Sequence, residues 1–214
     1  MSKTGITLKF GEREAAVVLV VFHIVGILGL SGAFKSWFLQ LTPFNLLLSL
    51  GCLLALQPSK NLKLLLFIVF SFTLGFGAEW LGVHTGYLFG DYHYGWVLGL
   101  KFDGIPLLIG VNWVMLTIVS GDLTRRFIKN RLLSVVLAAL LMTGLDYLIE
   151  PVAVQLGFWS WHSTQIPVFN YISWFLVALP MQWMYHSFAS GNNPAAKWLL
   201  LSQILFFAVL NYLL

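Results

Sequence analysis

Two carboxylates and a proline interrupt an otherwise apolar stretch near the middle of the chain. Asp146 and Glu150 stand four residues apart in 146–161, which reads DYLIEPVAVQLGFWSW, so on an α-helix they project from one face about one turn apart. Pro151 has no N–H and clashes with the preceding turn, so we expect the helix to bend or end there. The carbonyl oxygen it leaves free could hold a water molecule beside the acids.

Aromatic side chains and a third acid accompany this pair. Trp159 and Trp161 alternate just after the acids, and Glu79 lies in GFGAEW near the end of another apolar run. Acid, water and an aromatic wall together favour carbocation chemistry. Burying an ionisable side chain in a membrane costs at least ~2.5 kcal/mol, so such acids usually have a function. The alternative is a structural pair bonded to Lys101 or to tyrosine and tryptophan donors.

The composition indicates that a membrane surrounds these residues. The chain has 214 residues, of which 59% are hydrophobic and 9% charged, and its mean hydropathy is +0.86. These values predict one integral membrane domain, 1–214, since a soluble core could not hide so much apolar surface. The net charge of +4 comes from short loops and does not indicate nucleic-acid binding. Cys52 is the only cysteine, which excludes an intrachain disulfide and a cysteine-ligated metal cluster.

Seven apolar runs predict an all-α, polytopic bundle of about seven transmembrane helices. Each run is close to the length that crosses a hydrocarbon core, and together they lie near 15–30, 38–56, 62–83, 105–120, 132–153, 168–186 and 196–214. The first run follows Glu12 and Glu14 and lacks a small-residue cleavage pattern, so we interpret it as a span and not as a signal peptide.

Lysine and arginine are distributed unequally between the two sides of this arrangement. Ten fall on the side of the N-terminus: Lys3, Lys9, Arg13, Lys60, Lys63, Arg125, Arg126, Lys129, Arg131 and Lys197. Only Lys35 and Lys101 fall opposite. The positive-inside rule therefore predicts a multi-pass protein of the cell inner membrane, with a cytoplasmic N-terminus and the C-terminus outside. The stretches 84–104 and 154–167 then share the outer side and are expected to meet.

Those two outer stretches resemble each other. GYLFGDYHYG follows Glu79 and GFWSWH follows Glu150, each with glycine and alternating aromatic residues. Duplication and coincidence both remain open. The aromatic residues near the acids are candidates for substrate binding, although tryptophan and tyrosine also gather in belts at membrane interfaces. They are Trp80, Tyr87, Tyr92, Tyr94, Trp113, Trp159, Trp161 and Trp174.

Other chemistries find less support in the sequence. His84, His93 and His162 share the outer side with the acids, but the HxxxH and HxxHH clusters of membrane di-iron enzymes are absent, so no metal is expected. Asp122 is interpreted as a solvated partner of Arg125 or Arg126. The DxxxE of the central acids could be half of a diphosphate site, but a second acidic motif is missing and the basic residues lie across the membrane.

An ordered set of motifs resembles the carotenoid biosynthesis protein family of integral membrane hydratases. The set comprises EWLGVHTGYLFGDYHYG, GIPLLIGVNW, DYLIEP, GFWSW and IPVFNYISWF, and covers about residues 75–180. The family includes carotenoid 1,2-hydratases and the hydratase of the bacterioruberin pathway. Positions that match and that bear on a site include Glu79, Tyr92, Tyr94, Trp113, Asp146, Trp159, Trp161, Asn170 and Trp174. One departure is Glu150-Pro151, where many relatives carry Asp-Pro.

The resemblance implies addition of water to the terminal C1=C2 double bond of an acyclic carotenoid end group. Asp146, Glu150 and Glu79 would supply the acid and the base, Asn170 would belong to the substrate site, and no cofactor would be needed. The implied partners are an acyclic or monocyclic carotenoid, similar to lycopene or γ-carotene, together with the lipid bilayer and other enzymes of the pathway. Two alternatives stay open: a carotenoid cyclase that begins with the same protonation, and a non-catalytic transporter or assembly protein.

Overall fold

The computed structural model describes residues 10–163, 165–189 and 191–214. Within these ranges the chain forms seven helices, each overlapping one predicted apolar run: α1 (Glu12–Ser31), α2 (Lys35–Ala55), α3 (Leu62–Thr85), α4 (Leu107–Phe127), α5 (Arg131–Gln155), α6 (Val168–Phe188) and α7 (Pro194–Leu213). The predicted all-α helical bundle is therefore confirmed. Lys3 and Lys9, which contribute to the predicted orientation, lie outside the described residues.

The helices have the length and composition of membrane spans. Among the described residues, six helices are long and apolar enough to cross a membrane, and α6 is the one that falls short. The helix α6 has 21 residues, as many as α4, but it carries Asn170, Gln182 and His186 among its apolar side chains. About 20 mainly apolar residues span a hydrocarbon core, so the chain is a multi-pass membrane protein.

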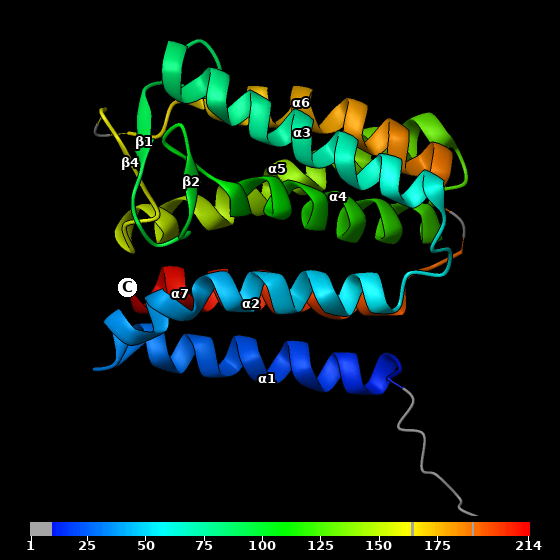
Figure 1. The fold of residues 1–214 in the computed structure, drawn as a ribbon, viewed down its shortest axis with the longest axis horizontal. Coiled ribbons are helices and arrows are strands. Elements are labelled where there is room, and N and C mark those ends of the chain that lie inside the picture. The colour runs from blue at the N-terminus through cyan, green and yellow to red at the C-terminus, as the bar shows by residue number, and fades with distance from the viewer. Residues whose placement is uncertain (1–9, 164, 190) are drawn as a thin grey trace, which may run out of the picture.

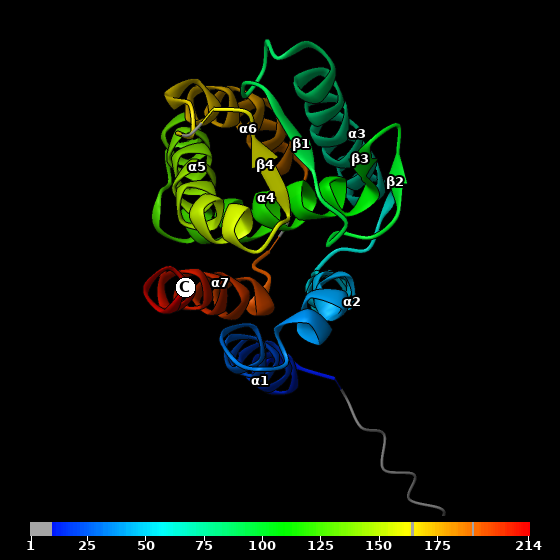
Figure 2. The same cartoon turned by 90° about the vertical axis from the view of Figure 1, so that its left-hand side faces the viewer.

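The helices form two groups that meet at α4. Helices α3, α4, α5 and α6 make a four-helix unit, and α1, α2 and α7 pack together along one side of it (Figure 1 and Figure 2). Helix α4 contacts neighbours in both groups. Along its most apolar stretch, 67% is buried inside the protein, compared with 22% for α2. Trp113 and Met115 on α4 are fully buried. The core is thus centred on α4, and the outer helices leave broad apolar faces for lipid.

Short strands close one end of the four-helix unit, which the sequence patterns did not predict. Strands β1 (Tyr92–Tyr94) and β4 (Trp159–Trp161) pair antiparallel and cross this end (Figure 2). This pairing confirms that the stretches 84–104 and 154–167 meet. Beside them, β2 (Lys101–Phe102) and β3 (Ile105–Pro106) form a small hairpin that leads into α4.

A glycine permits the two strand-bearing segments to approach closely. A side-chain carbon placed on Gly95 would lie 2.0 Å from the carbonyl oxygen of Gly157, a separation that atoms cannot adopt. The backbone N–H of Gly95 instead donates to the carbonyl of Phe158 at 2.8 Å. Any side chain at position 95 would therefore separate the segments that hold β1 and β4.

The sequence predicts that the helix either bends or ends at Pro151, and the second outcome is wrong. Helix α5 continues through Pro151 to Gln155, one turn further. A proline inside a helix removes one backbone hydrogen bond and leaves the flanking turns able to continue. Asp146, Glu150 and the residues up to Gln155 therefore belong to one continuous helix, which ends shortly before β4 begins.

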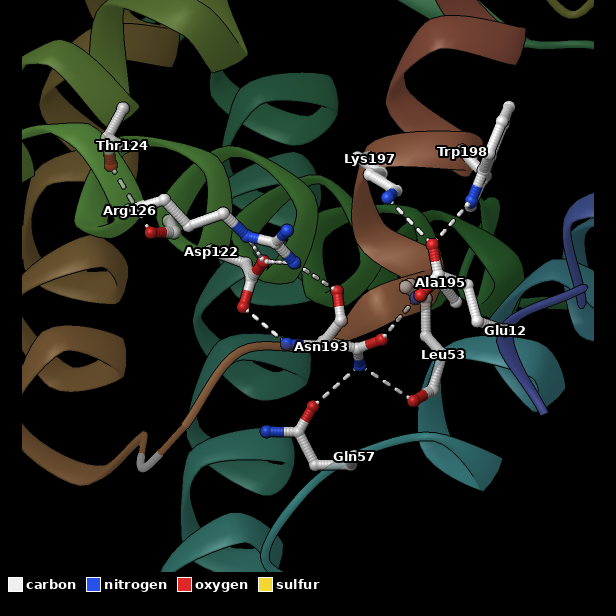
Figure 3. Close-up of polar contacts among 11 residues, drawn as sticks. Glu12, Leu53, Gln57, Asp122, Thr124, Arg126, Asn193, Ala195, Lys197 and Trp198 are labelled. Carbon is white, nitrogen blue, oxygen red and sulfur yellow. Dashed lines mark hydrogen bonds and ion pairs between the residues drawn. The ribbon is translucent and has the colours of Figure 1, made fainter.

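A buried polar network joins α4, α2 and α7 at the opposite end of the molecule (Figure 3). Asp122 pairs with Arg126 at 2.6 Å and accepts the backbone N–H of Asn193 at 2.7 Å. The side chain of Asn193 in turn donates to the Leu53 carbonyl and to Gln57, both at 2.8 Å. Asp122 is only 1% exposed, so its prediction as a solvated residue is wrong, although Arg126 is the expected partner. Hydrogen bonds from Arg126 and from the backbone of Asn193 replace its water shell.

Candidate active site

Glu79 is buried near the C-terminal end of α3 and is held by three donors from other elements. Its Oε2 accepts hydrogen bonds from the hydroxyls of Tyr92 at 2.5 Å and Tyr94 at 2.7 Å. Its Oε1 accepts one from the indole Nε1 of Trp113 at 3.0 Å. Three donors directed at one carboxyl group favour its anionic form. These donors therefore hold the Glu79 carboxyl group in one orientation.

Glu150 on α5 has an equivalent environment built from different residues. Its Oε2 accepts the indole N–H groups of Trp159 at 2.9 Å and Trp161 at 3.1 Å. Its Oε1 accepts from Asn170 Nδ2 at 3.2 Å. As at Glu79, every donor is a neutral group, so the carboxylate is stabilised by hydrogen bonds without a counter-ion. Lys101, the cation considered as a partner, instead donates to the Tyr94 carbonyl at 2.7 Å.

Asp146 differs from both glutamates in having a single donor. Its Oδ2 accepts from the same Asn170 Nδ2 at 3.1 Å, so one amide nitrogen bridges the two acids of α5. Its Oδ1 is buried and has no hydrogen-bond partner among the described residues. Because this oxygen has no donor, no hydrogen bond stabilises a negative charge on it. A neighbouring carboxylate disfavours a second negative charge as well. Asp146 is therefore the acid best suited to hold a proton.

The period of two along a strand explains how the donors converge. Tyr92 and Tyr94 lie on one face of β1, and Trp159 and Trp161 lie on one face of β4. In the ladder Tyr92 pairs with Trp161 and Tyr94 with Trp159, and the ring centroids of these pairs are 5.0 and 6.0 Å apart. Each strand thus serves one glutamate, and the four rings form a continuous aromatic layer over the acids.

The two tyrosines remain hydrogen-bond donors over a wide pH range. Burial is the main cause that raises the pKa of the Tyr92 and Tyr94 phenols well above the ordinary value of 10.0, and the negative charge of Glu79 adds to it. A phenol that stays neutral keeps its O–H directed at the carboxylate. The tyrosines therefore position Glu79 and do not exchange protons with it near neutral pH.

A small cavity lies between the three acids. Its volume is about 20 Å³, and its walls include the three acids, Asn170, both strand aromatics of β1 and of β4, Phe89, Ile109 and Trp174. A polar cavity of this size has room for one water molecule. Behind it, Trp174 stacks on Trp113 with ring centroids 3.8 Å apart and an interplanar angle of 15°, which makes the remaining wall rigid and aromatic.

A second cavity of about 320 Å³ lies next to the first and is much larger. It is enclosed mainly by residues of α1, α2, α4 and α7, and most of its lining is apolar. Ile109 and Trp159 line both cavities. These two side chains therefore lie between the larger apolar cavity and the small cavity lined by Glu79, Asp146 and Glu150, which we call the acid chamber.

Comparison with known proteins identifies the family. The sequence profile of the family described as "Carotenoid biosynthesis protein" matches residues 41–214, most of the chain. The chain belongs to the carotenoid biosynthesis protein family. A curated relative, "Bisanhydrobacterioruberin hydratase" of Haloarcula japonica, is 27% identical over 201 residues, covering 82% of this chain and 66% of the relative. The chain thus spans just under two-thirds of that relative's length. No solved structure matches the chain.

Most of the candidate residues of this carotenoid biosynthesis protein line the acid chamber. Trp113 does not line it but donates to Glu79 from behind its wall, and Trp80 and Tyr87 lie apart from it. Trp80 is 39% exposed and donates to Asp103 at 2.7 Å. Tyr87 is 79% exposed. Neither lines either cavity. Trp80 lies near the C-terminal end of α3, and Tyr87 lies just beyond it. Their position is that of interface aromatics.

The histidines His84, His93 and His162 do not line the acid chamber. His84 is near Asp103 at 3.4 Å, and His162 is near Asp91 at 3.0 Å. His93 occupies the outward face of β1 and contacts the ring of His162. Within the described residues, no group of three or more His, Cys, Asp or Glu side chains has the arrangement of a metal site.

Two chamber residues were missed by sequence reasoning. Phe89 is 1% exposed and has φ of 67°, a left-handed conformation that is unusual for a bulky residue. Ile109 lies on the first turn of α4, beyond Pro106. Phe89 lies in the alternating aromatic stretch GYLFGDYHYG, so a local signal for it was present, whereas no local pattern distinguishes Ile109 from core residues. The residues of α1 and α2 that line the larger cavity were also missed, because no local pattern distinguishes them from other residues of an apolar helix.

Equal spacing within the two halves of the site supports the resemblance of the outer stretches. Tyr92 and Tyr94 follow Glu79 by 13 and 15 positions, and Trp159 and Trp161 follow Asp146 by the same numbers. The residues so related occupy facing strands of one ladder. In this register the counterpart of Glu79 is Asp146, and Glu150 is the additional acid.

Proposed function

We propose that this protein is a carotenoid 1,2-hydratase, which adds water across the terminal C1=C2 double bond of an acyclic carotenoid end group. The observation that carries the proposal is the acid chamber: one carboxyl group with an unpartnered oxygen, two hydrogen-bonded carboxylates, room for one water and aromatic walls. The name of the Haloarcula japonica relative, a hydratase, supports it.

The hydrogen bonds support a different role for each acid in the proposed reaction. Asp146, with one donor, gives its proton to C2 of the substrate, and the π electrons of C1=C2 form the new C2–H bond. This leaves a tertiary cation at C1. Water attacks C1 through its oxygen and loses a proton to a glutamate carboxylate, Glu150 or Glu79, both of which line the chamber. One proton is given and one is taken up, so the sum is alkene plus water to tertiary alcohol.

The chamber walls suit the cationic intermediate. The rings of Trp159, Trp161 and the strand tyrosines line the chamber in which positive charge would develop. A desolvated aromatic face stabilises a cation by ~1–2 kcal/mol. The glutamates add charge of the opposite sign, and none of these groups depends on a cofactor.

The larger cavity suits the rest of the substrate. An acyclic carotenoid is a long apolar chain, and the apolar space that ends at Ile109 and Trp159 leads toward the acids. A substrate similar to lycopene or γ-carotene would lie there and insert only its end group between the two side chains. Entry from lipid is consistent with the exposed apolar faces of α1 and α2.

The test is conversion of lycopene in a host that makes it, followed by mass analysis of the pigment. We expect a product heavier by one water. In oxygen-18 water without air the product should carry the label, and in deuterium oxide the rate should fall because proton transfer to carbon is slow.

The other outcomes each exclude the proposal. A product of unchanged mass with a new ring would show a cyclase, and unchanged pigment bound to purified protein would show a carrier. Oxygen taken from dioxygen, or loss of activity with chelators, would require the outer histidines to be reconsidered as metal ligands.

A further inference from the structure

The larger cavity contains a group of polar side chains that the hydration reaction does not use. Its lining includes His23 from α1, Asn45 and Ser49 from α2, and Gln203 from α7. Thr42 from α2 and Asn112 from α4 also line it, so four helices contribute polar side chains to a space whose other walls are mostly leucine, isoleucine and phenylalanine. A cavity meant only for a hydrocarbon would not need them.

These polar groups are buried and incompletely satisfied. His23, Ser49 and Gln203 are 6%, 3% and 5% exposed. The amide oxygens of Asn45 and Gln203 are buried and have no hydrogen-bond partner among the described residues. Leaving a buried polar group unpaired costs about 1–3 kcal/mol, and such groups call for a ligand or a water. The two amides come from different helices and line the same cavity.

Together these side chains can both donate and accept hydrogen bonds. The Nδ1 atom of His23 lies 2.7 Å from the Leu19 carbonyl, so this nitrogen carries the hydrogen and Nε2 is left as an acceptor. Each amide presents either its oxygen or its nitrogen after a half-turn of its terminal torsion. A hydroxyl group, which donates one hydrogen bond and accepts others, matches this set. A carboxylate or phosphate does not, because no cation lines the cavity within the described residues.

We propose that His23, Asn45, Ser49 and Gln203 form a polar subsite that binds a hydroxyl group on an isoprenoid chain lying in the larger cavity. The identification of the chain as a carotenoid rests on the proposed function, but the subsite itself rests on the cavity. Because this cavity shares Ile109 and Trp159 with the acid chamber, the hydroxyl belongs to the part of the substrate that follows its reacting end. The subsite selects hydroxylated chains over plain hydrocarbons.

The experiment compares two ligands that differ only in a hydroxyl group. Geranyllinalool, a diterpene alcohol, and the corresponding hydrocarbon are titrated into purified protein, with quenching of tryptophan fluorescence as the readout, since Trp37 and Trp159 line the cavity. Protein carrying Asp146→Asn is used as the background so that neither ligand is converted. We expect the alcohol to be favoured, and Asn45→Leu or Gln203→Met to lower its preference about five- to tenfold, as expected for one hydrogen bond. Hydrocarbon binding should not change.

Ser202→Ala is the matched control. Ser202 is next to Gln203 on α7, and its hydroxyl is also buried without a described partner, but it does not line the cavity. Its substitution should leave the preference unchanged. The ratio between variants cancels the different partitioning of the two ligands into detergent.

Each remaining outcome decides the matter. Equal effects of the amide variants and of the serine control, or equal loss for alcohol and hydrocarbon, would overturn the subsite. Loss of stability in Asn45→Leu and Gln203→Met would also overturn it, because it would show that the amides have partners within the chain. A hydroxyl preference without hydration of either lycopene or a hydroxylated acyclic carotenoid would retain the subsite and refute the hydratase. Hydration without a hydroxyl preference would retain the hydratase and refute the subsite.

Discussion

Replacing each acid of α5 by its amide should separate catalysis from structure. In Asp146→Asn the new amide oxygen can still accept from Asn170, and the new amide nitrogen takes the place of an oxygen that had no partner. Few hydrogen bonds are lost, so we expect the free energy of unfolding to change by no more than about 1 kcal/mol. Turnover should fall about 10²- to 10⁴-fold, the usual contribution of a general acid.

Glu150→Gln should lose stability as well as turnover. Both oxygens of Glu150 accept N–H groups, two on Oε2 and one on Oε1. An amide nitrogen at either place would face a donor, so at least one hydrogen bond is lost and the others lose the charge of the acceptor. We expect a loss of about 2–4 kcal/mol in the free energy of unfolding. Each amide has nearly the same shape as the acid that it replaces. A difference in stability between the two variants therefore reflects the hydrogen bonds of the two acids.

The assay combines pigment conversion in a lycopene-producing host with thermal unfolding of the purified protein. Tyr147→Phe is the control on the same helix, because Tyr147 is exposed and packs only on the ring of Tyr171 among described aromatic contacts. It should retain full activity and stability. Turnover of Asp146→Asn within a few-fold of the wild type would refute its role as proton donor. Equal destabilisation of both amide variants would refute the assignment based on donor number.

Three further predictions concern other parts of the molecule. Reporter fusions should place the N-terminal end of this chain in the cytoplasm and the C-terminal end outside, and the same side for both would contradict the seven-span topology. Asp122→Ala should cost about 3 kcal/mol in unfolding experiments because it leaves Arg126 without its buried partner, whereas Glu12→Gln, at an exposed pair, should have no measurable effect. Burial raises the pKa of Tyr92 and Tyr94 in the folded state. Their contribution to stability should therefore be complete below pH 10 and become smaller as the pH rises further. In thermal unfolding measured against pH, Tyr92→Phe and Tyr94→Phe should each lose less stability above pH 10 than the wild type.

Local patterns in the sequence were sufficient to predict the membrane helices and to find the acids that lie within them. A run of about 20 apolar residues has few alternatives to a spanning helix, so the seven runs match the seven helices of the described residues. A carboxylate inside such a run is costly enough to be noticed without a structure. The alternation of aromatic residues near Glu79 and Glu150 was also visible, although its meaning as two paired strands was not.

Tertiary packing decided which donor serves which acid and where the cavities lie. The Trp113 indole reaches Glu79 across 34 positions of sequence, and Asn170 reaches Asp146 across 24. Asp122 is buried because Asn193, 71 positions away, donates to it. The larger cavity exists because α1, α2 and α7 meet α4 without filling the space between them. Hydropathy and periodicity describe the neighbours of a residue along the chain, whereas burial, donor number and empty volume depend on residues that only the packed helices bring together.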